Sequence, residues 1–390
     1  MIYLNNSATS YPKPACVLEA VERAVSGPPA GQFRGGGMQE TEDLFSSCRE
    51  LLGEILGIRE TERIFFSSGA TDSLNALFSG LGLTAENVIT TATEHNSVLR
   101  PLYNRGNAGC GPVIVPCDEN GFVDPESIRE AAAHFPAKER RAIVLNHCSN
   151  VTGAIQDAAA VGAIAGEYGF LFVLDCAQSA GCVPVQTDKW GVDALAFTGH
   201  KSLLGLQGTG GYYVRKDLPF IPARFGGTGR DSRKLVYSPD DYEYEPGTQN
   251  SPGIAALKAG CGWILSHGIG EIASRESGLR AFLAGELEKL PGVRVLGAHP
   301  EQGRRYGPVL SFTVKGLKSA DVSYILQNSY EIVTRAGLMC APLIHPFLKT
   351  EEDGTVRVSF SPFMEKANLA VLASALREIL SALAGSEDAT

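Results

Sequence analysis

Short apolar runs alternate with amphipathic segments along the first two thirds of the chain. This alternation is typical of a mostly parallel β-sheet that is covered by helices. A Gly- and Tyr-rich run at 208–214 predicts a hairpin that turns back on the sheet edge. Helices are expected between the strands, for example at 72–82 and 157–168. The apolar runs predict strands at 63–66, 87–91, 113–116, 141–146, 169–174 and 192–197.

The pattern changes after about residue 253. A long helical pattern runs to residue 290, where Pro291 and Gly292 interrupt it. Further helices are expected near 319–329 and 365–384, and β-like runs lie at 294–296, 308–314 and 356–360. This mixture predicts a smaller α+β domain behind a larger α/β domain.

Composition places the chain among ordinary globular proteins. It has 390 residues, of which 44% are hydrophobic and 20% charged, so it can bury a large core. With 34 Lys and Arg against 43 Asp and Glu, the net charge of −9 argues against nucleic-acid binding. No apolar run approaches the roughly 20 residues that cross a bilayer, and the first residues lack a secretion signal. We therefore expect a cytoplasmic protein without a membrane partner.

Nine cysteines are scattered along the chain without a Cys-x-x-Cys pair or a histidine at zinc-ligand spacing. We therefore expect no disulfide framework and no metal site. Small buried cysteines are common in protein cores, so most of the nine are expected to serve packing.

Four predicted strands end in segments with chemically active side chains. Ligands of open α/β sheets bind beyond the carboxyl ends of the strands, so these positions matter most. Residues 67–72 form a turn of small residues that opens a helix, which suits a phosphate group. His95 and Asp175 each follow a strand, and Lys201 follows the strand predicted at 192–197. Taken singly, each of these residues is more often structural than functional.

Together, these residues match the requirements of pyridoxal 5'-phosphate. Its phosphate needs amides and hydroxyls, its ring a stacking partner, its pyridinium nitrogen a carboxylate, and its aldehyde a lysine. His95 can supply the stacking, Asp175 the carboxylate, and Lys201, which lies 26 residues after Asp175, the amine. We therefore expect pyridoxal 5'-phosphate as the cofactor.

The sequence resembles the class V aminotransferase and cysteine desulfurase group of fold-type I enzymes over nearly its whole length. The resemblance rests on Tyr-Leu-Asn-Asn-Ser-Ala-Thr at 3–9, Ser-Gly-Ala-Thr at 68–71, Glu-His-Asn at 94–96, Ser-Asn-Val-Thr-Gly at 149–153, Asp-Cys-Ala-Gln-Ser at 175–179, Thr-Gly-His-Lys at 198–201, Phe-Gly-Gly-Thr-Gly at 225–229 and Glu-Pro-Gly-Thr-Gln-Asn at 245–250. It implies an α/β fold with a mostly parallel sheet in a large domain, residues 15–255. A smaller α+β domain would comprise residues 1–14 and 256–390.

The resemblance also implies roles for individual residues. Lys201 would form the Schiff base and carry protons, His95 would stack on the ring, and Asp175 would keep the ring nitrogen protonated. Thr228 would reach the phosphate of a neighbouring subunit, which implies a homodimer with shared sites. The implied cofactor-binding residues are Ala70, Thr71, His95, Asn150, Asp175, Gln178, Thr198, His200, Lys201 and Thr228.

Residues 334–345 resemble the Arg-x-Gly-x-x-Cys segment of cysteine desulfurases. Cys340 would attack the substrate sulfur there, and the Gly and Pro residues around it predict a loop. The other eight cysteines are then all expected to be structural. Arg357, in a β-like run, would hold the substrate carboxylate with two hydrogen bonds, as such arginines do in the family. Substrate contacts are also expected from Ala8, Asn150 and Arg335.

The resulting hypothesis is a cysteine desulfurase that releases alanine and leaves a persulfide on Cys340, with a possible sulfur-acceptor protein as partner. The base that would activate Cys340 stays open between His95 and His345. Alternatives with the same cofactor are a selenocysteine lyase or an aminotransferase for another small amino acid. A serine hydrolase built on Ser179 is disfavoured because Ala177 occupies a position that needs glycine. A catalytically silent sulfur-trafficking scaffold is disfavoured because Lys201 and Asp175 are both present.

Overall fold

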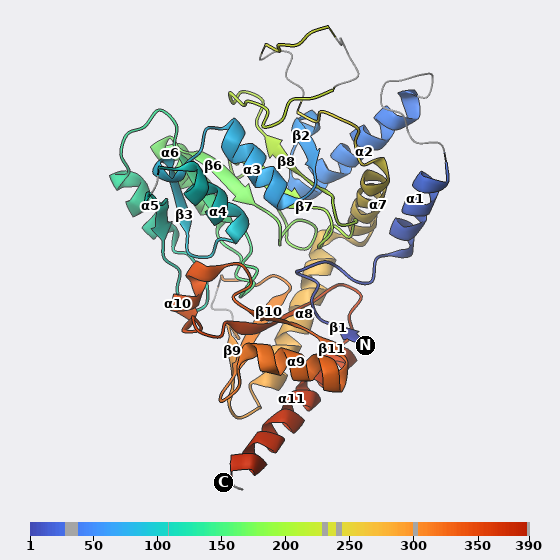
Figure 1. Cartoon of the computed structure of the whole chain (residues 1–390), viewed down its shortest axis with the longest axis vertical. Helices are drawn as coiled ribbons and strands as arrows, with labels where there is room; N and C mark the ends of the chain where they lie inside the picture. Colours follow the sequence, from blue (N-terminus) through green and yellow to red (C-terminus); the bar gives the residue numbers. More distant parts are fainter. Residues whose placement is uncertain (28–37, 108, 228–232, 239–243, 299–302, 388–390) are drawn as a thin grey trace.

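A computed structural model describes the chain apart from residues 28–37, 108, 228–232, 239–243, 299–302 and 388–390 (Figure 1). Two sheets lie in the upper and lower parts of the molecule in this view, and helices α7 (Ser251–His267) and α8 (Ile269–Leu287) run from one part to the other. The division of the chain at residue 255 stays a prediction.

The larger sheet has seven strands in the order β2-β8-β7-β6-β5-β3-β4. All strands predicted for this region are present, within two residues of the expected ends. Neighbours from β7 to β4 are parallel, whereas β8 is antiparallel to both β7 and β2. The strands are β2 (Ile64–Ser67), β3 (Val88–Thr91), β4 (Val113–Val115), β5 (Ala142–Asn146), β6 (Leu171–Asp175), β7 (Ala194–Thr198) and β8 (Gly210–Val214).

The hairpin prediction for 208–214 was right in direction and wrong in position. β8 does turn back antiparallel to β7, but β2 pairs with its other side, so β8 is an inner strand and β2 forms the edge. Glycines permit this close approach: a Cβ on Gly210 would lie 2.5 Å from Cα of Gly69. A local sequence pattern does not reveal that a strand from much earlier in the chain closes the sheet.

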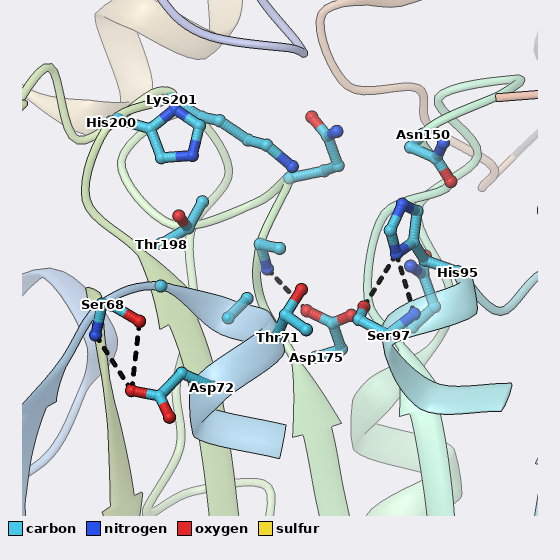
Figure 2. Close-up of a pocket in the computed structure, with 15 residues that line it drawn as sticks. Ser68, Thr71, Asp72, His95, Ser97, Asn150, Asp175, Thr198, His200 and Lys201 are labelled. Carbon is cyan, nitrogen blue, oxygen red and sulfur yellow. Dashed lines mark hydrogen bonds between the residues drawn. The ribbon is translucent and has the colours of Figure 1, made fainter. Parts of the chain in front are cut away.

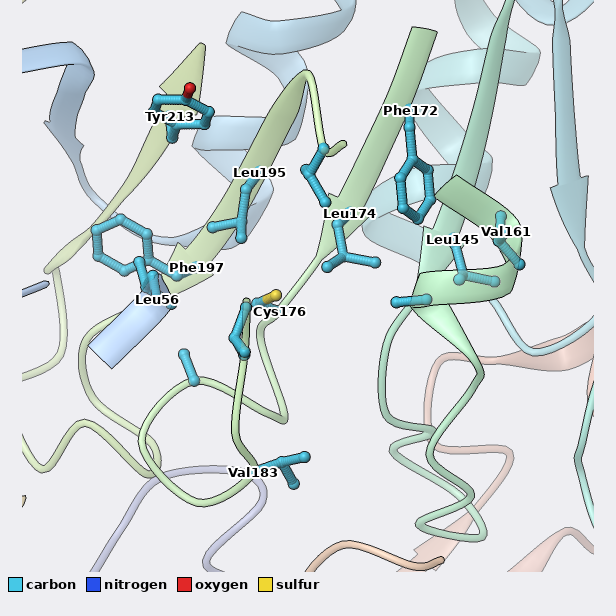
Figure 3. Packing of buried hydrophobic residues seen from close by; sticks show 14 of the residues in the cluster. Leu56, Leu145, Val161, Phe172, Leu174, Cys176, Val183, Leu195, Phe197 and Tyr213 are labelled. Atoms are coloured by element: carbon cyan, nitrogen blue, oxygen red, sulfur yellow. The ribbon is translucent and has the colours of Figure 1, made fainter. Parts of the chain in front are cut away.

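Helices cover both faces of the larger sheet, because successive side chains along each strand point to opposite faces. On one face, Phe172, Leu174, Leu195 and Phe197 pack in a core with α2, α5, α6 and α7 (Figure 3). The opposite face packs against α3 and α4. The helices are α1 (Ala15–Ser26), α2 (Met38–Leu56), α3 (Ala70–Gly80), α4 (Asn96–Arg105), α5 (Pro125–His134), α6 (Ala158–Tyr168) and α7 (Ser251–His267), with short 3-10 turns at Thr61–Arg63 and Ala85–Asn87.

The smaller sheet has the order β12-β13-β10-β9, and a separate parallel pair joins β1 to β11. The long helical pattern is two helices that part at Gly268, and β12 was not foreseen. The strands are β1 (Ile2–Tyr3), β9 (Val293–Leu296), β10 (Val309–Val314), β11 (Ile332–Val333), β12 (Arg335–Gly337) and β13 (Thr355–Ser359). The helices are α8 (Ile269–Leu287), α9 (Ser319–Tyr330), α10 (His345–Leu348) and α11 (Lys366–Glu387), with a 3-10 turn at Pro342–Ile344.

In the part of the chain that the structure describes, one helix is long and apolar enough to span a membrane. It is α11, over Lys366–Ala384. The sequence prediction of no such segment missed it because Arg377 and Glu378 interrupt the apolar run. Leu369 and Leu372 of α11 are buried in the core of the smaller sheet. Over the whole span, 33% of the residues are buried inside the fold.

Candidate active site

A cavity of about 200 Å³ lies where β2, β3, β5, β6 and β7 end (Figure 2). Nine of the ten predicted cofactor-binding residues line this cavity, and the tenth, Thr228, lies outside the described residues. Lys201 and His95 extend into it from opposite sides. The lining residues are Ser68, Gly69, Ala70, Thr71, Asp72, His95, Ser97, Asn146, Asn150, Asp175, Ala177, Gln178, Thr198, His200 and Lys201.

One end of the cavity is built from the start of α3. Gly69 is the N-cap of this helix and supplies no side-chain cap, so the first amides at Ala70 and Thr71 lack intrahelical partners. Gly69 has a φ of 145°, a conformation that side chains rarely adopt. The exposed amides and the helix dipole make this end suitable for a phosphate group.

Asp72, in the first turn of α3, would oppose an anion if its charge were free. Its Oδ2 instead accepts hydrogen bonds from the Ser68 amide over 3.1 Å and the Ser68 hydroxyl over 3.2 Å. The guanidinium of Arg224 lies 3.0 Å from the same oxygen. This ion pair offsets the carboxylate charge beside the phosphate end.

Asp175 and Lys201 form the centre of the site. Asp175 ends β6, is 2% exposed, and its Oδ1 accepts a hydrogen bond from the Ala177 amide over 2.9 Å. Burial raises the pKa of Asp175, while the Ala177 amide and Lys201 oppose that change. Burial lowers the pKa of Lys201 to about 8, and the charge of Asp175 opposes this shift. An amine with this pKa has a substantial neutral fraction near neutral pH, which nucleophilic attack requires.

His95 is the N-cap of α4 and is held by Ser97. Its Nδ1 accepts a hydrogen bond from the Ser97 amide over 3.0 Å and lies 2.8 Å from the Ser97 hydroxyl. Burial lowers the pKa of His95 to about 4, and the positive charges of Lys201 and Arg357 add to this shift. The imidazole is therefore neutral at neutral pH, with its proton on Nε2, and its ring orientation is fixed.

Glu94 is a site residue that the sequence analysis did not single out. It is fully buried, and its Oε1 accepts hydrogen bonds of 2.8 Å from the Thr91 hydroxyl and from the Asn146 amide. Burial raises the pKa of Glu94 to about 8. The residue joins the ends of β3 and β5 and directly precedes His95. The sequence did contain one sign of its role, because Glu94 is an acidic residue between a predicted buried strand and the candidate residue His95.

Two hydrogen bonds join the main chain of the Cys340 loop to residues that follow strands β3 and β5. The Asn96 amide donates to the Cys340 carbonyl over 2.7 Å, and the Asn150 Nδ2 donates to the Met339 carbonyl over 2.6 Å. Met339 and Cys340 have φ angles of 52° and 58°, a left-handed conformation that non-glycine residues adopt infrequently. Cys340 is exposed, and a negative charge on its sulfur would raise the pKa values of Lys201 and Arg357. The loop prediction is thus confirmed, and the loop borders the cavity without lining it.

Arg357 links the loop region to the N-terminal segment. It is 4% exposed, and its guanidinium donates to the Asn150 carbonyl over 2.9 Å and to Asn5 Oδ1 over 3.1 Å. Burial lowers the pKa of Arg357 to about 10, and the charge of Arg335 contributes. Arg335 is exposed and pairs with Arg357 in the β12–β13 register. Two arginines on one sheet face suit a carboxylate ligand.

Ala8 lies in an exposed turn of the N-terminal segment, where its amide donates to the Asn5 carbonyl over 3.0 Å. It does not line the cavity. Gln178, which does line it, donates through Nε2 to the Ser7 carbonyl over 3.1 Å. The N-terminal segment is therefore anchored beside the site.

The residues fit pyridoxal 5'-phosphate. A buried polar atom without a hydrogen-bond partner destabilises the fold, and several such atoms lie in or beside the cavity. They include Asn146 Oδ1, Asn150 Oδ1, His200 Nδ1 and Arg357 Nε. A ligand with a phosphate, an aromatic ring and a bound amino acid would supply partners for such groups.

The comparison with known proteins decides the family. The family model described as "Aminotransferase class-V" matches residues 2–372. The chain belongs to the class V aminotransferase family. This confirms the resemblance seen in the sequence, and the family is one of enzymes.

Curated relatives of this class V aminotransferase carry related names. It is 29% identical over 388 residues to a probable cysteine desulfurase of Methanothermobacter thermautotrophicus, with 97% of this chain and 94% of the relative covered. It is 30% identical over 295 residues to the cysteine desulfurase IscS of Dictyoglomus turgidum, with 74% and 70% covered.

Solved structures confirm the fold of this class V aminotransferase. The cysteine desulfurase of Thermococcus onnurineus matches with a TM-score of 0.86 and 29% identity, covering 98% of this chain and 95% of that one. The cysteine desulfurase CsdA of Escherichia coli matches with a TM-score of 0.82 and 26% identity, covering 97% and 94%. The predicted fold-type I architecture is correct.

Each of the nine cysteines of this class V aminotransferase is free in the structure. The prediction that all cysteines other than Cys340 serve packing was too broad, because Cys110 is exposed and Cys16 is half-buried. Cys176, next to Asp175, points into the core of the larger sheet (Figure 3). No cluster of His, Cys, Asp and Glu among the described residues could hold a metal ion. Ser179 is fully buried, so a nucleophilic role for it has no access to substrate.

Proposed function

We propose that this protein is a pyridoxal-phosphate-dependent cysteine desulfurase that converts L-cysteine to L-alanine and forms a persulfide on Cys340. The observation that carries the proposal is the attachment of the Cys340 loop to Asn96 and Asn150, which brings an exposed thiol beside the cavity of Lys201 and Asp175. The names of the relatives support the same activity.

The proposed cofactor would be held by the nine cavity residues that were predicted for it. Ala70, Thr71, Thr198 and His200 would hold the phosphate, His95 and Asp175 the ring, and Lys201 the aldehyde carbon. When bound, pyridoxal 5'-phosphate draws electrons away from the α-carbon of an amino acid and so makes its proton removable. Asn150 and Gln178 would lie near the ring hydroxyl.

Three side chains of the protein would bind and transform the substrate. Arg357 would bind the substrate carboxylate, with Asn150 beside it and Arg335 adding positive charge. Lys201 would remove the α-proton through its Nζ and return a proton later. The Cys340 thiolate would attack the substrate sulfur: a sulfur–sulfur bond forms, the carbon–sulfur bond breaks, and the electron pair stays with the carbon fragment, which gains protons to become alanine.

His345, a candidate base for Cys340, has both ring nitrogens engaged. Its Nδ1 lies 2.7 Å from the Thr350 hydroxyl, and its Nε2 lies 3.1 Å from the Leu338 carbonyl. The carbonyl can only accept, so the proton is on Nε2 and the Thr350 hydroxyl donates to Nδ1. We therefore propose that His345 holds the loop in place and does not deprotonate the thiol.

We further propose a cytoplasmic homodimer that passes its sulfur to an acceptor protein. Large apolar side chains are exposed in the segments that flank Thr228, including Leu235 at 88% and Val236 at 83%. Apolar surface of this kind is typical of protein contacts. A neighbouring subunit that covers it would bring Thr228 to the phosphate, as the resemblance implies.

A comparison of two cysteine variants tests the proposed function. Purified protein loaded with the cofactor is mixed with cysteine and an excess of a thiol reductant, which releases the persulfide sulfur as sulfide, and alanine and sulfide are measured together. We expect Cys340→Ala to abolish both products from cysteine, while Cys110→Ala, which changes another exposed thiol, leaves them unchanged. Undiminished sulfide from Cys340→Ala would refute the nucleophile, and alanine without reduced sulfur would indicate transamination. Selenocysteine as a parallel substrate separates a lyase from a desulfurase.

A further inference from the structure

The carbonyl oxygen of His200 accepts four hydrogen bonds from the N-terminal segment. The Ser10 amide donates over 3.0 Å, the Thr9 hydroxyl over 3.1 Å, the Ser10 hydroxyl over 3.2 Å and the Lys13 ammonium over 3.0 Å. Carbonyl oxygens have two lone pairs, so this degree of engagement is unusual. The carbonyl belongs to the peptide group whose nitrogen is that of Lys201.

Lys13 is the charged member of this group. Its Nζ also donates to Ser10 Oγ over 2.6 Å, and within the described residues no carboxylate lies at salt-bridge distance from it. Lys13 is half-buried, and burial lowers its pKa to about 8. Burying an ammonium group without an acidic partner reduces the stability of the fold. We therefore expect the hydrogen bond from Lys13 to the His200 carbonyl to serve a function.

Lys13 does not line the cavity, so it acts on the site through this peptide group. The side chains on both sides of the peptide, His200 and Lys201, do line the cavity. Hydrogen bonds from charged donors are shorter and stronger than those from neutral ones, so the ammonium contributes most to holding the carbonyl. A fixed peptide plane fixes the direction in which the Lys201 side chain leaves the backbone.

We propose that Lys13 is a positioning residue, which clamps the His200–Lys201 peptide so that the Lys201 amine and the His200 imidazole point at the cofactor. This inference rests on the cofactor assignment in the proposed function. The same hydrogen bonds hold residues 5–13 of the N-terminal segment, which include Asn5 and Ala8, against the site. Lys13 would therefore order both the N-terminal segment and the His200–Lys201 peptide.

The experiment measures cofactor binding in three variants of the full chain. Lys13→Met keeps the length and removes the charge, Lys13→Arg restores it, and Lys216→Met changes an exposed lysine away from the cavity. The readouts are the dissociation constant for pyridoxal 5'-phosphate, the rate at which the covalent visible band forms, and the melting temperature of the cofactor-free protein.

We expect Lys13→Met to weaken cofactor binding roughly tenfold and to slow formation of the band by a similar factor, because one charged hydrogen bond is lost. Lys13→Arg should recover most of both, and Lys216→Met should match the unchanged protein. Wild-type affinity and band formation in Lys13→Met would overturn the inference. The inference would also be overturned if Lys13→Met lost cofactor affinity together with a lower melting temperature and Lys13→Arg did not restore the affinity.

A milder variant covers the case in which Lys13→Met fails to fold. Ser10→Ala removes one donor to the carbonyl and one acceptor of Lys13, and roughly a two- to fivefold slower band formation is expected. No change in Ser10→Ala together with an unfolded Lys13→Met would refute the positioning role. None of these readouts involves sulfur release, so a protein that binds the cofactor without desulfurase activity would refute the proposed function alone.

Discussion

Asn150 and Met339 are joined by a hydrogen bond of 2.6 Å from a side-chain amide to a main-chain carbonyl. Asn150 lines the cavity, and Met339 directly precedes Cys340. The carbonyl of Asn150 in turn accepts from Arg357. Asn150 therefore connects the proposed carboxylate site, the proposed cofactor site and the Cys340 loop.

Replacement of Asn150 by Ala should loosen the Cys340 loop. The variant loses the donor to the Met339 carbonyl, so amide hydrogen exchange at 338–341 should accelerate, and kcat/KM for cysteine should fall roughly tenfold to a hundredfold. Asn104→Ala, at an exposed position, is the matched control. Unchanged hydrogen exchange in the Asn150 variant would show that the loop is held by other contacts.

Replacement of Arg357 by Lys should impair substrate binding more than the chemical step. A lysine cannot form two parallel hydrogen bonds with a carboxylate, so KM for cysteine should rise roughly tenfold or more, with a smaller change in kcat. Arg377→Lys, on the exposed face of α11, should leave both constants unchanged. A wild-type KM in the Arg357 variant would remove this residue from the proposed carboxylate site.

The rate of covalent cofactor attachment should depend on pH through Lys201. Only the neutral amine attacks an aldehyde, and burial lowers the pKa of Lys201 from 10.5 to about 8. We expect the rate to rise with pH and to level off above about pH 8, as followed by stopped-flow absorbance. Lys201→Ala should give no covalent band. A rate that keeps rising to about pH 10 would mean an unshifted lysine.

Replacement of Glu94 by Gln should alter the pH dependence of stability. Burial raises the pKa of Glu94 from 4.5 to about 8, so between these values the folded protein holds a proton that the unfolded chain releases. The free energy of unfolding then falls as pH rises across this window, by at most about 1.4 kcal/mol per pH unit from this residue.

Glutamine keeps an oxygen that can accept from Thr91 and Asn146 but cannot ionise, so the Glu94→Gln variant should lose this part of the pH dependence. Urea unfolding at several pH values between 5 and 8 measures the difference between the two proteins. The exposed substitution Glu119→Gln provides the control. Parallel curves for Glu94→Gln and the unchanged protein would show that Glu94 is already ionised at neutral pH.

The cofactor side of the site was visible in the sequence because its residues lie at strand ends. Apolar runs mark the buried parallel strands, and the carboxyl ends of parallel strands share one edge of the sheet. The order of the residues along the chain was therefore enough to place the side chains of Asp175 and Lys201 together. Their motifs also resemble a known family, which assigned roles to Thr71, Asn150 and His200.

Other parts of the site had no such local signal. Glu94 is an ordinary charged residue in the sequence, and the structure buries it completely against Thr91 and Asn146 at the ends of β3 and β5. The four hydrogen bonds on the His200 carbonyl join segments about 190 residues apart, which no periodicity records. β2 likewise closes the outer edge of the sheet against β8, although the chain between them passes through five other strands.

The amino-acid sequence alone was enough to predict the family, the main strands and helices, and the side chains that line the cavity. Each of these depends on local patterns and on the order of the parallel strands. The contact between Asn96 and Cys340, the pairing of Asn150 with Met339, and the clamp of Lys13 on the His200 carbonyl required the folded chain. These contacts depend on how two sheets and the N-terminal segment pack against each other, and packing is set by the shapes of surfaces that the chain brings together only when it folds.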